Sequence, residues 1–107
     1  MKKTKVAKTI ERFLIKHELD SDVAIYFNNK CWDYDTDGTK TITEGVKGSD
    51  YCEYANDETI TMTFEGPLLD ALNMHYGYAL YEAFNELDFD NHYFEMGYHW
   101  SCSFYPN

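Results

Sequence analysis

The sequence predicts an α+β fold, a single small domain in which an antiparallel sheet of about four to five strands is covered by two helices. Two observations predict it: apolar residues recur at helical spacing in two segments, and they alternate with polar residues in several shorter ones. The expected order of elements is α-β-β-β-β-α-β. Because 107 residues are enough to bury one core, we expect a single domain over residues 1–107.

The first predicted helix covers residues 5–17. Val6, Ile10 and Leu14 fall on one face of it, which predicts packing against a sheet. A second face is basic, and we expect it to be solvated or to complement an acidic surface. Its members are Lys5, Lys8, Arg12 and Lys16.

A strand and a hairpin are expected next. Alternating apolar residues predict a strand over 23–27. Residues 30–46 follow as a hairpin, because the Asp-Gly pair at 37–38 is a strong signal for a type I′ turn. In that register Asp35 lies opposite Lys40, an oppositely charged cross-strand pair.

The second half of the chain is expected to hold a loop, a strand, a helix and a final strand. The loop covers 47–57, and strict alternation predicts the strand over 59–64. Pro67 suits the first turn of the helix, which the apolar spacing predicts over 68–87. The last strand, over 94–104, has the longest alternation in the chain.

Charge is divided unevenly along the chain. Six of the nine basic residues lie in positions 1–16, where one acidic residue leaves a net charge of +5. Positions 17–107 hold eighteen carboxylates and three lysines, a net charge of −15. A body this acidic repels nucleic acid, because phosphate contacts need lysine and arginine, and it is attracted to basic clefts on other proteins.

The cysteines and the hydropathy bear on the compartment. Three cysteines are an odd number and predict reduced thiols, which fits a cytoplasmic location. No apolar stretch follows the basic start and no apolar run approaches eighteen residues, so we expect neither a signal peptide nor a membrane contact.

Residues 33–44 match the pattern Asp-x-Asp-x-Asp-Gly-x₅-Glu and resemble an EF-hand calcium loop. The resemblance implies Ca²⁺ as a cofactor, held by the ligands Asp33, Asp35, Asp37, Thr39 and Glu44. Lys40 stands where such loops carry an apolar residue, and the flanking segments have the pattern of strands. We therefore prefer an acidic hairpin and keep the calcium site as an alternative.

No catalytic motif is present, and we expect a protein that is not an enzyme. The four histidines are dispersed, and no histidine or cysteine pair has zinc-ligand spacing. Glu95 and His99 would share one face of the last strand, either as an acid–base pair or, the interpretation we prefer, as an exposed polar row.

These observations favour a small acidic protein that binds and inhibits or regulates a basic, nucleic-acid-processing partner. In size, charge and aromatic content it is similar to phage or mobile-element inhibitors of restriction or CRISPR systems. A tyrosine-rich interaction domain is the other alternative, because ten tyrosines exceed what a small core takes in. The candidate acidic contacts are Asp33, Asp35, Asp37, Glu44, Asp50, Glu53, Asp57, Glu58, Asp88 and Asp90, and the aromatic ones are Trp32, Tyr34, Tyr51 and Tyr54.

Overall fold

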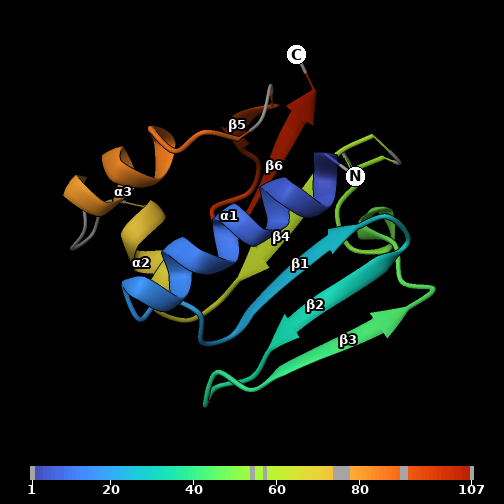
Figure 1. Ribbon diagram of the computed structural model, residues 1–107, viewed down its shortest axis with the longest axis horizontal. Coiled ribbons are helices and arrows are strands. Elements are labelled where there is room, and N and C mark those ends of the chain that lie inside the picture. The colour runs from blue at the N-terminus through green and yellow to red at the C-terminus, as the bar shows by residue number, and fades with distance from the viewer. Residues whose placement is uncertain (1, 54, 57, 74–77, 90–91, 107) are drawn as a thin grey trace.

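The computed structural model describes residues 2–53, 55–56, 58–73, 78–89 and 92–106. These residues form α-helices, a short 3₁₀ helix (η1) and β-strands, arranged as in Figure 1. None of the helices in these ranges is long and apolar enough to cross a bilayer. In chain order the elements are α1 (Lys2–Lys16), β1 (Val23–Phe27), β2 (Lys30–Tyr34), β3 (Lys40–Glu44), η1 (Gly48–Asp50), β4 (Ile60–Phe64), α2 (Pro67–Leu72), α3 (Tyr78–Asn85), β5 (His92–Met96) and β6 (Ser101–Pro106).

All neighbouring strands of the sheet are antiparallel, in the order β3-β2-β1-β4-β6-β5. The helix α1 crosses one face of the sheet, which we call the front face, and α2 and α3 lie at its side (Figure 1). We call the opposite face the back face. The α+β class and the antiparallel sheet are therefore confirmed, with six strands in place of the four to five expected.

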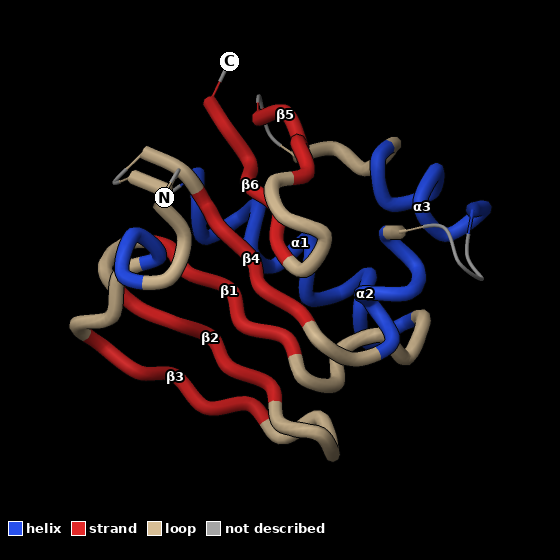
Figure 2. Tube along the Cα trace, turned by 180° about the vertical axis from the view of Figure 1, so that it is seen from behind, coloured by secondary structure: helices blue, strands red, loops and turns tan. Residues whose placement is uncertain are grey.

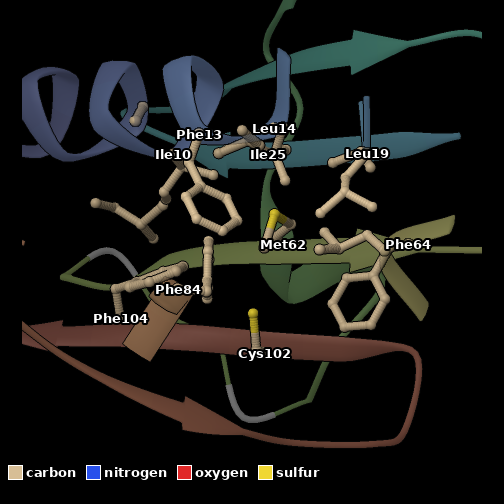
Figure 3. Packing of buried hydrophobic residues seen from close by; sticks show 14 of the residues in the cluster. Ile10, Phe13, Leu14, Leu19, Ile25, Met62, Phe64, Phe84, Cys102 and Phe104 are labelled. Carbon is tan, nitrogen blue, oxygen red and sulfur yellow. The ribbon is translucent and has the colours of Figure 1, made fainter. Parts of the chain in front are cut away.

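The apolar core lies between α1 and the front face. Val6, Ile10 and Leu14 are fully buried, as the helical spacing predicts. Figure 3 shows Ile10 and Leu14 on the same side of α1 and directed toward the sheet, where Ile25 and Met62 meet them. Strand alternation supplies the other half of the core, because every second residue of a strand points to the same face.

The back face is covered in part by a segment of residues 45–53, 55–56 and 58–59, which includes η1 (Figure 2). This segment buries hydroxyl groups between itself and the sheet. The Thr61 Oγ1 atom lies 3.3 Å from Thr59 Oγ1 and 2.9 Å from Ser103 Oγ. Because these hydroxyl groups bond to one another, a polar layer is buried there without losing its hydrogen bonds.

The helix predicted over 68–87 is two helices, α2 and α3. Asn73 follows α2, and its side-chain amide donates to the carbonyl oxygens of Leu69 and His99, at 2.7 Å each. Asparagine competes with the backbone for hydrogen bonds and so favours helix ends over helix interiors. Periodicity alone overlooked this break because the apolar spacing continues on both sides of it.

The strand predicted over 94–104 is a hairpin of β5 and β6. Its turn is closed by bonds from Gly97 N to Ser101 O and from Ser101 N to Tyr98 O, both 3.0 Å. The alternation of apolar and polar residues indicated one strand because Met96 pairs with Cys102, and both side chains lie on the same face. When even-numbered residues of one strand pair with even-numbered residues of the next, the alternation runs through the hairpin as it would along a single strand.

The hairpin at 30–46 is present, but its register differs by one residue from the predicted one. Asp35 N donates to Thr39 O at 3.0 Å and Gly38 N to Asp35 O at 2.8 Å, so the loop is longer than a two-residue turn. Lys40 therefore pairs with Tyr34 instead of Asp35. A shift of one residue moves every side chain of a strand to the other face, which takes Lys40 to the front.

On the front face Lys40 joins a polar cluster at the margin of the core. Its Nζ atom lies 2.6 Å from Glu11 Oε2 and 3.8 Å from the centroid of the Trp32 ring. Tyr34 Oη donates to the same Glu11 oxygen at 2.6 Å. Burial raises the pKa of the Glu11 carboxyl, but the hydrogen bonds from Lys40 and Tyr34 outweigh it and hold the pKa below its ordinary value.

This cluster predicts a contribution to stability that depends on pH. Because the Glu11 pKa is lower in the folded chain, its contribution is present above its ordinary value of 4.5 and is lost as the pH falls through the folded pKa. We expect Glu11→Gln to lower the free energy of unfolding at pH 7 by about 1 kcal/mol, allowing for solvent screening. Urea titrations of the wild type and the variant, at pH 7 and at stepwise lower pH, measure this difference in the free energy of unfolding.

The matched control is Glu58→Gln, a change at an exposed carboxylate whose backbone N–H bonds Asn56 Oδ1. Its unfolding free energy should follow the wild-type pH dependence. If Glu11→Gln also lost stability below pH 4.5 as steeply as the wild type, the cluster would not be the source of that dependence.

Candidate functional site

A concave site of about 390 Å³ lies on the back face, where β2, β1 and β4 meet the turn before β6. We call it the acidic groove. Its lining includes four carboxylates, Asp22, Asp33, Asp35 and Glu65, and five aromatic residues, Tyr26, Tyr34, Tyr51, Phe64 and Trp100. No lysine, arginine or histidine is among its lining residues.

The backbone holds three of these carboxylates in a row across the sheet. Asp22 N donates to Asp35 O at 3.4 Å, and Glu65 N donates to Asp22 O at 3.1 Å. The three residues thus continue β2, β1 and β4, whose spacing is about 4.8 Å. Asp33 stands two residues before Asp35 on the same face, about 6–7 Å along the strand.

The turn after β2 fixes Asp22 from the other side. Thr36 Oγ1 donates to Asp22 Oδ1 at 2.9 Å, and Asp22 has a left-handed backbone with φ 57°. Aspartate tolerates that conformation better than most residues. Asp22, Asp35 and Asp37 also line a shallower hollow beside the groove, so the negative surface extends onto the turn.

Tyrosine and tryptophan rings form the remaining wall. The Tyr26 and Tyr51 rings lie 5.3 Å apart between centroids, and the Trp100 ring stacks on Tyr98 at 5.1 Å. Tyr51 is 58% exposed, so its ring is available to a ligand. Burial, together with the nearby Cys31, raises the pKa of Tyr26 to about 12, and this phenol stays neutral at physiological pH.

The Tyr98 ring is tied to the segment that covers the back face. Tyr98 Oη donates to Glu53 Oε1 at 2.8 Å, and this bond raises the pKa of the phenol. The contact joins the β5–β6 turn to the residues after η1. It positions the stacked pair of Tyr98 and Trp100 beside the groove.

The structure brings together part of the predicted contact set. Asp33, Asp35 and Tyr51 line the groove, as does Tyr34 with 2% of its surface exposed, and Asp37 lies in the hollow next to it. Glu44 does not join them, because it pairs with Lys30 at the other end of the β2–β3 ladder. The other predicted acids within the described ranges are exposed and lie outside the groove: Asp50, Glu53, Glu58 and Asp88. Tyr54, Asp57 and Asp90 fall outside the residues that the structure describes.

Two predicted contact residues are corrected. Trp32 is 6% exposed and Tyr34 is 2% exposed, and both belong to the core on the front face. They pair with Ile42 and Lys40, whereas the predicted register, with Asp35 opposite Lys40, would set Thr43 and Thr41 opposite them. Their rings pack under Lys40 and against Glu11, so neither side chain is free to contact a partner.

The EF-hand arrangement is not formed. Asp33 pairs with Thr41 and Glu44 pairs with Lys30, three pairs apart in the ladder, or about 10 Å. The two side chains also point to opposite faces of the sheet, because their positions along the paired strands differ in parity. In the described ranges no three histidine, cysteine or acidic side chains are grouped to hold a metal ion.

The prediction that Glu95 and His99 share one face of the last strand is also corrected. Glu95 lies in β5 opposite Ser103, whereas His99 lies in the turn before β6. The two residues therefore do not share one strand face. Both are exposed.

Among the groove residues that sequence reasoning missed are Asp22, Glu65, Tyr26 and Trp100. Parity gave a usable signal for Tyr26, which alternates with the buried Ile25 and Phe27 and so had to face away from the core. Asp22 and Glu65 flank strands that are far apart in sequence, and only the β1–β4 pairing joins them.

No family model matches this chain, and neither a curated protein nor a solved structure gives a match. The chemistry of the groove therefore has to be taken from its own residues. Carboxylates accept hydrogen bonds from guanidinium and ammonium groups, and aromatic rings attract the same cations. The groove is suited to a cationic ligand.

Proposed function

We propose that the back face binds a basic surface on a nucleic-acid-processing protein, and that this chain is a non-catalytic inhibitor or regulator of it. The proposal places the chain in the functional class of nucleic-acid mimics, to which phage and mobile-element anti-restriction and anti-CRISPR proteins belong. The observation that carries it is the acidic groove, a concave site lined by four carboxylates and by no basic side chain.

The arrangement of charge supports this choice of partner. A basic cleft that binds nucleic acid presents lysine and arginine at positions that suit phosphate groups. The row of Asp35, Asp22 and Glu65, with Asp33 beside it, offers negative charges at regular spacing on a rigid sheet. Arginine gains twice in such a site, because its guanidinium pairs with a carboxylate and stacks on Trp100 or Tyr51.

The position of the basic residues supports it further. Lys8, Arg12 and Lys16 lie on α1, which covers the front face. Lys40 also points to the front, where it contacts Glu11. Lys47 belongs to the segment that covers part of the back face, but it does not line the acidic groove. A basic partner that approaches the groove therefore meets carboxylates first, and electrostatic steering would favour that orientation.

The tyrosine-rich interaction domain remains a second candidate, because Tyr51, Tyr93 and Tyr98 are large side chains with 58%, 46% and 41% of their surface exposed. Tyrosine is enriched at protein interfaces that do not depend on charge. The two candidates differ in what they require. Mimicry requires the carboxylates, and a tyrosine interface requires the rings.

The experiment is a capture assay with purified protein on a host lysate, followed by affinity measurement for the captured nucleic-acid-binding protein. We expect the double variant Asp33→Lys/Asp35→Lys to weaken binding by about 100-fold, or about 1.4 kcal/mol for each reversed charge. Binding by the wild type should also weaken steeply between low and high salt. Competition with duplex DNA then tests whether the two ligands share a surface.

A matched control is Glu82→Lys/Glu86→Lys, which makes the same change of charge at two exposed positions, one in α3 and one directly after it. It should leave the affinity within about threefold of the wild type if the site is the groove. Equal affinity for the wild type and the Asp33/Asp35 variant, unchanged by salt, would contradict mimicry. Loss of binding in Tyr51→Ala alone would then favour the tyrosine interface.

A further inference from the structure

The strand β3 forms one edge of the sheet and is exposed along its whole length. It pairs with β2 on one side, and the strand order ends with it on the other. All five of its residues are exposed, and Ile42 at its centre has 54% of its surface accessible. An edge of this kind presents unpaired backbone groups to another strand.

The hydrogen bonds of the β2–β3 ladder show which backbone groups point outward. Gly45 N donates to Asn29 O at 2.8 Å and Asp35 N donates to Thr39 O at 3.0 Å. Both bonds join odd-numbered residues, and hydrogen-bonded pairs alternate along an antiparallel ladder. The N–H and C=O groups of Thr41 and Thr43 therefore point to β2, and those of Lys40, Ile42 and Glu44 point to the free edge.

We propose that this edge pairs with the β3 strand of a second copy of the chain, antiparallel and with its two-fold axis at Ile42. The sequence Lys-Thr-Ile-Thr-Glu is self-complementary in that arrangement. Lys40 faces Glu44 of the second copy twice, and Ile42 faces its equivalent. Opposite charges and matched β-branched residues are favourable cross-strand pairs.

The direction of the backbone groups agrees with this register. The directly paired residues would be Lys40 with Glu44 and Ile42 with Ile42, and these are the residues whose N–H and C=O groups point outward. A register shifted by one residue would set these groups against inward-pointing ones of the second copy. Two-fold symmetry and the hydrogen-bonding pattern thus select the same pairing.

The side chain of Lys40 extends from this edge over β2 toward α1. Glu11 and the Trp32 ring fix its ammonium group at 2.6 Å and 3.8 Å. An ammonium group has three donors, so it accommodates Glu44 of the second copy as well as Glu11.

The resulting dimer has one continuous sheet and leaves the acidic groove open. Directly paired residues in an antiparallel ladder lie on the same face, so the two-fold axis is perpendicular to the sheet. Both back faces then point to the same side. Five residues from each copy make a small interface, and we expect reversible association.

Sedimentation velocity on the wild-type protein, from about 10 μM to about 1 mM, tests the proposal. We expect a sedimentation coefficient that rises with concentration toward that of a dimer. Glu44→Lys sets lysine against Lys40 in both pairs and should raise the dissociation constant at least about tenfold. Ile42→Pro removes an outward N–H without removing a bond to β2 and should have a similar effect.

The matched control is Glu86→Lys, which makes the same change of charge away from the edge and should dimerise like the wild type. Circular dichroism melting shows whether each variant is folded, and Glu44→Lys keeps the test decisive if Ile42→Pro unfolds. A wild-type protein that stays monomeric at all concentrations overturns the proposal. So does a dimer that the folded Glu44→Lys variant leaves intact.

Discussion

Replacing Phe84 with alanine is expected to lower the free energy of unfolding by about 3–5 kcal/mol. The side chain is fully buried and comes from α3, the last helix in the chain. Its ring centroid lies 5.2 Å from that of Phe94. It also lies 5.3 Å from that of Phe13 and 6.1 Å from that of Phe104, two residues that Figure 3 shows around Phe84. Truncation of Phe84 therefore leaves a cavity between α1, the sheet and α3.

Guanidinium chloride titration followed by tryptophan fluorescence measures the loss. Tyr93→Ala serves as the control, because Tyr93 is an aromatic residue of β5 that is 46% exposed. It should cost less than about 1.5 kcal/mol, including its stacking on Tyr105. A loss below about 1 kcal/mol for Phe84→Ala would show that α3 does not seal the core in solution.

Gly66→Ala is the second large effect, and we expect it to lower stability by about 2–3 kcal/mol. A Cβ atom on Gly66 would lie 2.6 Å from the carbonyl oxygen of Ser21, which is backbone and cannot turn aside. The residue precedes α2 directly, and its neighbour Glu65 is bonded to Asp22. Relief of the clash has to displace the backbone at Ser21 and Asp22.

The contrast is Gly45→Ala, where nothing lies within 4 Å of the added carbon but φ is +75°. The left-handed backbone alone should cost about 1 kcal/mol. Chemical denaturation of the two variants compares a steric clash with a backbone preference. Equal losses would contradict the close approach at Ser21. Since Asp22 lines the acidic groove, Gly66→Ala should also weaken partner binding, and Gly45→Ala should not.

Periodicity predicted the elements whose evidence lies within a few residues. The apolar faces of α1 and of the strand at Val23–Phe27 follow from local spacing, and the structure confirms them. The break after Asn73 and the turn at Gly97 were missed because each leaves the apolar spacing on either side unchanged. Patterns of polarity report which face a residue occupies and do not report where an element ends.

The acidic groove was beyond the reach of local spacing for a different reason. Asp35, Asp22 and Glu65 become neighbours only because β1 lies between β2 and β4 in the sheet. Strand order depends on which strands bury the most apolar surface together, and that is a property of the whole fold. The same limit explains Trp32 and Tyr34, whose face could be named only once α1 was known to cover it.

The position of β1 in the sheet also has a consequence for how the chain folds. The strands β1, β2 and β3 come from one continuous stretch and pair across short turns. The β1–β4 ladder joins residues 35 to 41 positions apart and is the seam between this meander and β4, β6 and β5. Closing a long loop costs more entropy than closing a short turn, so the meander forms readily and the seam closes late. Until then β1 keeps an open edge under α1, and the time needed to close the seam is the period in which a newly made chain is most exposed to pairing with a wrong strand.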